Sequence, residues 1–239
     1  MKNRGMGHIE IVLAFIIFIV SLTFALQFFN PAKSEKFVSA SLPFALDVIE
    51  ENASTDVIYY SVKINNGVIP GGNDIIQINL PTSYSPLLNS RVENYSGTVL
   101  PSKTFNNSGD VGMYVKWENN DYILIKLSDA LSLHLNPPSM GAYDQSYYNI
   151  SSNNIRTLIS ENKIISLNSS YLNNYQSLRE QFNLNRVDFA FNLDFSEYEF
   201  ISVKRDVPRG SEIFSDSKRV EVLRQSGAIN HANLKVSVW

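Results

Sequence analysis

The most prominent pattern along the chain is an apolar run close to its start. From Ile11 to Phe29 every residue is apolar except Ser21, Thr23 and Gln27. At 1.5 Å per residue, a helix of this run is about 28 Å long, which is close to the thickness of the hydrocarbon core of a bilayer. The pattern predicts a transmembrane or assembly helix over residues 6–29.

The charges on either side of this run predict its orientation. Lys2 and Arg4 precede the run, and Lys33 and Lys36 follow it. By the positive-inside rule, the residues before the run lie in the cytoplasm and the long remainder of the chain lies outside. The sequence therefore predicts a single-pass protein of the cell membrane with a cytoplasmic N-terminus and an extracellular head.

Three interpretations of the start of the chain remain open. The first is a plain uncleaved membrane anchor. The second is a secretory signal cleaved after Thr23-Phe24-Ala25, a small-x-small site, although apolar residues continue beyond it to Phe29. The third is a short leader that is cut off before the apolar helix.

The third interpretation rests on a resemblance. Arg4-Gly5, then Met6-Gly7-His8-Ile9-Glu10, then the apolar helix, resembles the class III signal of type IV prepilins. The resemblance implies that prepilin peptidase cuts between Gly5 and Met6, so that residues 1–5 are a leader peptide. It also implies that Glu10 pairs with the new N-terminal amine of a neighbouring subunit during assembly. A carboxylate at the edge of a membrane helix needs such a partner, unless it is solvated in the headgroup region.

A second helical pattern follows. Val38, Leu42, Leu46 and Ile49 recur at spacings of three and four residues. The pattern predicts a helical stalk over residues 30–55.

Residues 56–239 are dominated by alternating apolar and polar positions, which predict a β-rich head domain. Two alternating segments separated by residues 118–121 predict a β-hairpin. Another hairpin is predicted around the turn Gln225-Ser226-Gly227. The clearest strand pattern places five apolar residues on one face: Val187, Phe189, Phe191, Leu193 and Phe195.

One long amphipathic helix is predicted within the head. Ser160 is a favourable N-cap, and an apolar stripe extends from Ile164 to Phe182. Tyr171 and Tyr175 lie in this stripe, and we interpret them as core residues rather than as a ligand site. The predicted fold class is α+β: an N-terminal transmembrane helix with a helical stalk, then a mostly antiparallel β-rich head with one long amphipathic helix packed on the sheet.

The composition excludes several kinds of function. The net charge of −3 gives no basic surplus for binding nucleic acid. The absence of cysteine excludes disulfides and thiolate metal sites. A charged fraction of 18%, in a chain rich in Asn, Ser and Tyr, suits an extracellular surface better than a cytosolic enzyme.

The candidates for chemistry are few. His8, His134 and His231 lack the spacing of a metal site. Asp188 and Asp194 share the polar face of the predicted strand, near Glu197, and two such carboxylates can bind a cation or act as an acid/base pair; a solvated strand face is the alternative. No phosphate-binding loop or nucleophile elbow is present. We predict no enzymatic activity, no cofactor and no metal.

Sequons of the form N-x-S/T are a further feature of the predicted exported part. They make five asparagines possible sites of N-glycosylation: Asn52, Asn94, Asn106, Asn149 and Asn168.

The combination of a prepilin-like start, a helical stalk and a β-rich head resembles archaeal type IV pilin-like surface proteins. That resemblance implies a membrane-anchored structural subunit of a cell-surface filament or secretion-type assembly. Its partners would be the membrane, prepilin peptidase and copies of itself or of related pilins. The alternative is a single-pass surface binding or adhesion protein that does not polymerise. An ectoenzyme would have only Asp188 and Asp194 to support it.

Overall fold

The computed structural model describes residues 6–28, 31–81, 88–107, 110–132, 138, 140–196 and 199–239, and at 6–9, 26–28, 31–37, 106–107 and 110–111 the backbone alone. The helices are α1 (Met6–Phe28), α2 (Pro31–Ala53) and α3 (Glu161–Gln181). The strands are β1 (Ser54–Ile64), β2 (Ile75–Asn79), β3 (Asn89–Asn94), β4 (Val99–Leu100), β5 (Ser102–Asn107), β6 (Asp110–Lys116), β7 (Tyr122–Ser128), β8 (Tyr148–Ser160), β9 (Phe189–Ser196), β10 (Glu199–Val203), β11 (Phe214–Leu223) and β12 (Ile229–Val238).

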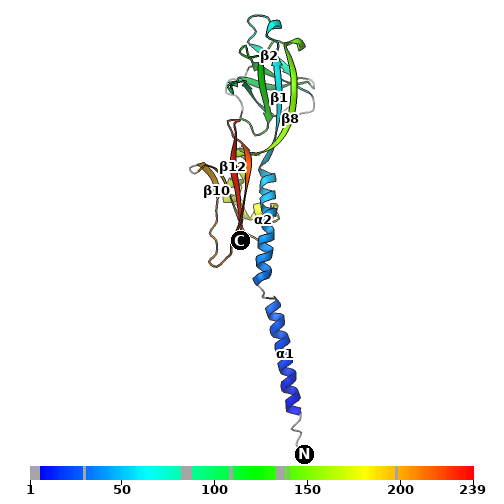
Figure 1. The fold of residues 1–239 in the computed structure, drawn as a ribbon, viewed down its shortest axis with the longest axis vertical. Coiled ribbons are helices and arrows are strands. Elements are labelled where there is room, and N and C mark those ends of the chain that lie inside the picture. The colour runs from blue at the N-terminus through cyan, green and yellow to red at the C-terminus, as the bar shows by residue number, and fades with distance from the viewer. Residues whose placement is uncertain are drawn as a thin grey trace, which may run out of the picture.

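The molecule is elongated, with α1 at one end and two β-rich lobes towards the other (Figure 1). The proximal lobe contains α3, the second half of α2, and strands β9 to β12. The distal lobe contains β2 to β7 together with β1 and most of β8. The two lobes are continuous because α2 leads directly into β1, and because β8 pairs with β1 and then reaches β11.

Two sheets organise the lobes. The larger has nine strands in the order β10-β9-β12-β11-β8-β1-β7-β3-β4, and the smaller has the order β2-β6-β5. The nine-stranded sheet is mixed, because β8 and β11 are parallel where Ile159 and Ser160 lie beside Val222 and Leu223. Its other neighbouring strands are antiparallel.

The core of the distal lobe lies between the two sheets. Tyr60 of β1 and Ile125 of β7 belong to the same buried cluster as Ile78 of β2 and Met113 of β6. Each of these residues lies on the apolar side of an alternating strand, so that two half-apolar sheets bury their inner faces against one another. The distal lobe is therefore a small β-sandwich.

This arrangement contradicts the predicted hairpin across residues 118–121. β6 pairs with β2 and β5, whereas β7 pairs with β1 and β3 in the other sheet. The connection contains Glu118 and Asn119 with φ of 49° and 58°, and it crosses from one sheet to the other. Alternation predicted both strands, but it carries no information on which strands are hydrogen-bonded neighbours.

The core of the proximal lobe lies between its strands and the two helices α2 and α3. Tyr171 of α3 packs edge-on against Phe189 and Phe191 of β9, with ring centroids 5.4 and 6.1 Å apart. The hydroxyl of Ser160 accepts a hydrogen bond from the backbone N–H of Lys163 at 3.3 Å and caps α3. The helix predicted from Ser160 and the hairpin predicted around Gln225–Gly227 are both confirmed.

The predicted fold class as a whole was wrong. Among the residues whose side chains the structure describes, no helix is both long and apolar enough to cross a membrane. The predicted transmembrane anchor and the predicted single-pass location in the cell membrane are corrected accordingly.

The head also differs from the prediction. Its main sheet is a mixed sheet of nine strands, because β8 and β11 are parallel, and it runs through both lobes. The predicted stalk is a stalk only in part, since Ala45, Leu46, Ile49 and Ala53 in the second half of α2 are buried in the proximal core.

A buried ionic cluster ties the distal lobe to the β11–β12 turn of the proximal lobe. Lys126 of β7 donates to Glu93 of β3 at 2.8 Å and to the carbonyl of Gly227 in that turn at 3.3 Å. Arg91 donates to the other carboxylate oxygen of Glu93 at 2.8 Å. Gly227 has a φ of 79°, and a Cβ there would come within 2.0 Å of the Arg91 side chain, so glycine permits the close approach.

This cluster makes stability depend on pH. Burial raises the pKa of Glu93, but the hydrogen bonds and charges of Lys126 and Arg91 outweigh burial and hold the pKa below its usual range. Because the pKa is lower in the folded protein, the stabilisation is present above the unfolded-state value of about 4.3 and is lost as the pH falls through the folded-state pKa.

We expect Glu93→Gln to lower the free energy of unfolding by about 2–3 kcal/mol at pH 7, because it leaves the ammonium of Lys126 buried without a carboxylate. Urea denaturation measures the loss, and the difference from the wild type should shrink below about pH 4. Glu118→Gln is the matched control, since its partner Lys116 lies 3.8 Å away and both side chains are exposed. Its change should stay within about 0.5 kcal/mol, and equal losses in the two variants would contradict a role for the buried cluster.

Candidate functional site

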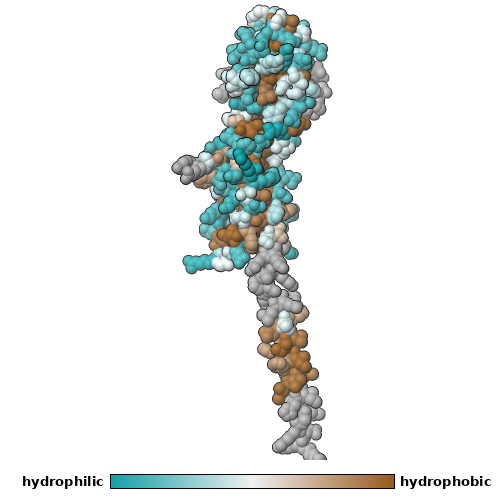
Figure 2. Space-filling model, in the orientation of Figure 1, coloured by the Kyte–Doolittle hydropathy of each residue, from teal (hydrophilic) through white to brown (hydrophobic). Residues whose placement is uncertain are grey.

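The strongest candidate for a functional surface is α1. Its large apolar residues between Ile11 and Phe24 keep 42–69% of their surface exposed. Successive residues of a helix point about 100° apart, so Ile16, Ile17 and Phe18 already cover most of the circumference. Figure 2 shows this part of α1 as a brown, apolar column outside the body of the protein. A helix that is apolar on every side is one that is normally buried.

The polar groups of α1 are few. Glu10 is exposed, and among the described side chains of the helix, residues 10–25, it is the only charged one. The hydroxyl of Thr23 donates to the backbone carbonyls of Val20, at 3.1 Å, and of Ile19. The hydroxyl of Thr23 is therefore satisfied within the helix, whereas the charge of Glu10 would require a partner if α1 were buried among apolar surfaces.

The predicted cleavage site lies at the edge of the structure. Gly5 is outside the described residues, and Met6 begins α1 with its backbone alone described. Glu10 lies four residues after Met6, about one turn of helix, so the two ends of the predicted pair would be about 6 Å apart along the axis in one chain. Cleavage between Gly5 and Met6 stays a prediction.

The five sequons lie on different elements. Asn149 on β8 is exposed, and Asn52 on α2 is exposed with its amide donating to the carbonyl of Val48 at 2.8 Å. Asn94 is half-buried, and its side-chain oxygen accepts from the backbone N–H groups of Ser96 and Thr98.

The other two asparagines are less accessible or not described. Asn168 on α3 has a buried side-chain oxygen without a hydrogen-bond partner among the described residues. The backbone of Asn106 lies in β5, and its side chain is outside the described part. Glycosylation of these residues stays a prediction, and accessibility favours Asn149 over Asn168.

The aspartates considered for chemistry do not form a pair. Asp188 precedes β9 and accepts hydrogen bonds from Arg179 and from the hydroxyl of Tyr175, both at 2.8 Å. Asp194 lies within β9 and accepts from the amide of Asn192 at 2.5 Å. Glu197 is outside the described residues. Asp188 therefore belongs to a structural contact between β9 and the end of α3.

The surroundings of Asp188 account for an unusual tyrosine. Burial, together with the hydrogen bond and charge of Asp188, raises the pKa of Tyr175 to about 12. Burial likewise raises the pKa of Tyr171, whose hydroxyl donates to the carbonyl of Phe189. Both tyrosines lie in the proximal core, as interpreted from the sequence.

The histidines offer no site within the described structure. His231 lies exposed on β12, while His8 and His134 are outside the residues whose side chains are described. Among the described residues, no three His, Asp or Glu side chains are placed so that they could hold a metal ion.

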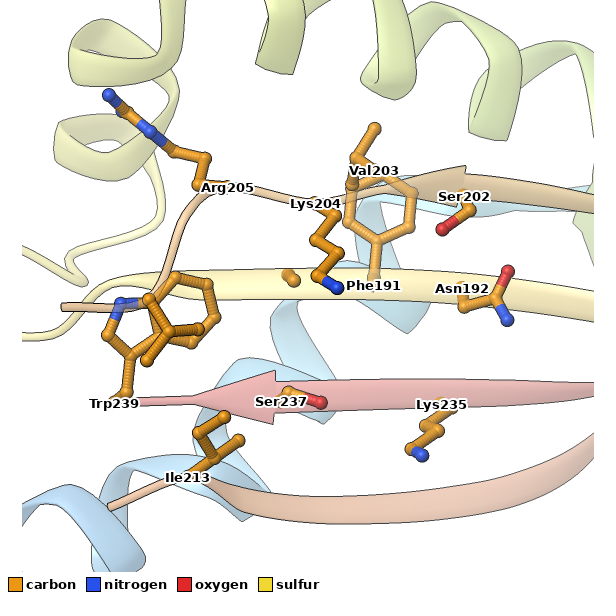
Figure 3. Close-up of a pocket in the computed structure, with 12 residues that line it drawn as sticks. Phe191, Asn192, Ser202, Val203, Lys204, Arg205, Ile213, Lys235, Ser237 and Trp239 are labelled. Carbon is orange, nitrogen blue, oxygen red and sulfur yellow. The ribbon is translucent and has the colours of Figure 1, made fainter. Parts of the chain in front are cut away.

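One surface feature was missed in the sequence. Strands β10, β9 and β12 form a hollow on their outer face, away from α2 and α3, and we call it the basic hollow (Figure 3). Its principal side chains are Asn192, Ser202, Lys204, Lys235, Ser237 and Trp239. Each of them lies on the polar side of an alternating segment, which was the available signal, but the sequence does not show that the three strands are neighbours.

The chain was compared with family models, curated proteins and solved structures. The chain matches no protein family model, no curated protein and no solved structure. Arguments about function therefore rest on the residues themselves.

We expect Asp188→Asn to lower the free energy of unfolding by about 1–2 kcal/mol, because it weakens the bonds to Arg179 and Tyr175. Removing the carboxylate charge should also lower the pKa of Tyr175, which absorbance titration of tyrosinate detects. Asp194→Asn serves as the control on the same segment and should change stability by less than about 0.5 kcal/mol. A catalytic pair would instead lose an activity in both variants while stability stayed unchanged.

Proposed function

We propose that this protein is a pilin-like structural subunit that assembles with copies of itself, or with related subunits, through α1. One observation carries the proposal: α1 exposes large apolar side chains around its whole circumference. The proposal concerns a filament or secretion-type assembly, and the prepilin-like order of residues around Gly5 and Glu10 is its second support.

Exposure of the apolar surface of α1 to water is energetically unfavourable, so we expect other molecules to bury it. Each square ångström of apolar surface removed from water contributes about 25 cal/mol. The described part of the chain does not supply the cover, since residues from Ile11 to Phe24 remain largely exposed against it. Helices of other copies have the same length and the same apolar surface, so a bundle of α1 helices buries it on every side.

The shape of the molecule suits such a bundle. α1 extends away from the lobes along the long axis (Figure 1), so its sides are open to helices of neighbouring copies. The lobes would then lie around the bundle. An apolar helix folded back against its own sheet would not leave this surface available.

Glu10 provides the register in this proposal. A bundle of uniformly apolar helices can slide, because apolar contacts are not directional. A single carboxylate that must find a cationic partner fixes one axial offset between neighbours. The N-terminal amine of Met6 in an adjacent copy, released by cleavage after Gly5, would be that partner.

We expect a cysteine introduced at Ile16 to form disulfide-linked dimers under mild oxidation, because α1 helices of adjacent copies would lie in contact. The chain has no cysteine of its own, so the introduced thiol is unique. Ser177→Cys, at an exposed position on α3, is the control and should stay monomeric. Non-reducing gel electrophoresis of the full-length protein gives the measurement.

The same cross-linking experiment tests whether Glu10 sets the register between neighbouring helices. Adding Glu10→Lys to the Ile16→Cys chain should reduce dimer formation about tenfold, the equivalent of about 1.4 kcal/mol. If Ile16→Cys and Ser177→Cys cross-linked equally, or if neither did, assembly through α1 would be wrong. If cross-linking were undiminished with Glu10→Lys, Glu10 would have no role in register, and assembly through α1 would still stand.

A further inference from the structure

We propose that the basic hollow binds a sugar acid, meaning a hydroxylated six-membered ring that carries a carboxylate. The hollow has a volume of about 200 Å³, enough for one small ring (Figure 3). It lies on the proximal lobe and involves no residue of α1. This inference is therefore independent of the proposed assembly, and either can fail without the other.

The register of three strands builds the floor of the hollow. Asn192 of β9 lies opposite Ser202 of β10 on one side and opposite Lys235 of β12 on the other. Two residues back along β9, Ala190 lies opposite Ser237 of β12. Side chains alternate between the faces of a strand, so these residues project together from the outer face. The small side chain of Ala190 leaves the space that the larger side chains surround.

Two lysines make the hollow positively charged. Lys204 reaches over the strands from one side and Lys235 projects from β12, as Figure 3 shows. No carboxylate side chain is among the lining residues, and neither lysine forms an ion pair with a described residue. The guanidinium of Arg205 is occupied elsewhere, 4.1 Å from the centre of the Tyr175 ring. The charge favours an anion as ligand.

The polar groups on the floor of the basic hollow favour a ligand that donates hydrogen bonds. The side-chain oxygen of Asn192 is buried and has no partner among the described residues, while its amide nitrogen is bonded to Asp194. An unpaired buried acceptor is costly, and a ligand hydroxyl that enters beside Ser202 would satisfy it. The hydroxyl of Ser237 shares one hydrogen bond with Ser215 at 2.8 Å and keeps capacity for another.

One end of the basic hollow is apolar, and this favours a ligand with a sugar ring that can pack against it. Trp239, Ile213 and Val207 are apolar residues that line the hollow. The face of an aromatic ring carries negative charge density and attracts the polarised C–H groups of a sugar. A carboxylate for the lysines, hydroxyls for Asn192 and Ser237, and a C–H face for Trp239 are combined in a uronic acid. A simple inorganic anion offers only the first of these.

Calorimetric titration of the full-length protein with sodium glucuronate tests this proposal. Glucuronate should bind, while glucose should bind at least about tenfold more weakly because it lacks the charge. Lys204→Ala and Lys235→Ala should each weaken glucuronate binding by about tenfold. Lys63→Ala, at an exposed lysine on β1 of the distal lobe, is the matched control and should bind as the wild type does. Circular dichroism on each variant checks that the fold is intact.

The nature of the ligand is resolved by two further probes. Sodium sulfate should not compete with glucuronate at equal concentration, since it cannot donate to Asn192 or pack on Trp239. Tetragalacturonate that binds tighter than the single sugar would indicate a residue of a polysaccharide as the ligand, whereas equal affinity would indicate a free sugar acid. The proposal is overturned if glucuronate does not bind, if glucose or sulfate matches it, or if both lysine variants bind normally.

Discussion

Apolar side chains on every side of α1 set the central physical constraint on this protein. Most surface helices have one apolar stripe, which they bury against their own domain. α3 is an example, since its residues Tyr171 and Leu178 are buried in the proximal core. In the part of α1 whose side chains are described, the body of the chain covers no such stripe. Because the described residues leave α1 exposed, we propose that contacts with other copies of the protein cover it.

The two lobes are connected at several places. The second half of α2 is buried in the proximal core, so the segment that follows α1 is firmly attached to the body. β1 continues directly from α2 into the distal lobe, and β8 returns alongside it to α3. Lys126 and Glu93 then tie the distal lobe to the β11–β12 turn.

Local signals in the sequence were sufficient for elements held together by near neighbours. The cap at Ser160 and the spacing of its apolar stripe predicted α3, and alternation around Gly227 predicted the β11–β12 hairpin. The same kind of alternation led to a wrong prediction of a hairpin between β6 and β7. Met113 and Ile125 belong to one buried cluster, but their strands lie in different sheets of the sandwich. Apolar spacing in α2 indicated a helix but not that Ile49 is buried in the head.

The candidate sites show the same limit. Asp188 and Asp194 look equivalent in the sequence, yet Asp188 lies before β9 beside α3, and only the fold brings Arg179 to it. The basic hollow depends on β12 lying beside β9, across more than thirty residues of chain, so no local pattern indicates it. Glu10 was singled out from the order of residues alone, and the role proposed for it concerns contacts between chains.

Hydrogen exchange at the backbone amides of α1, followed by mass spectrometry at rising protein concentration, tests the central claim most directly. If α1 is the surface through which copies assemble, protection across residues 10–25 should increase with concentration until it matches that of the buried strands, while exchange in β1 and β9 stays constant. Exchange in α1 that remained fast and independent of concentration would show that other copies do not cover this helix, and assembly through α1 would be wrong.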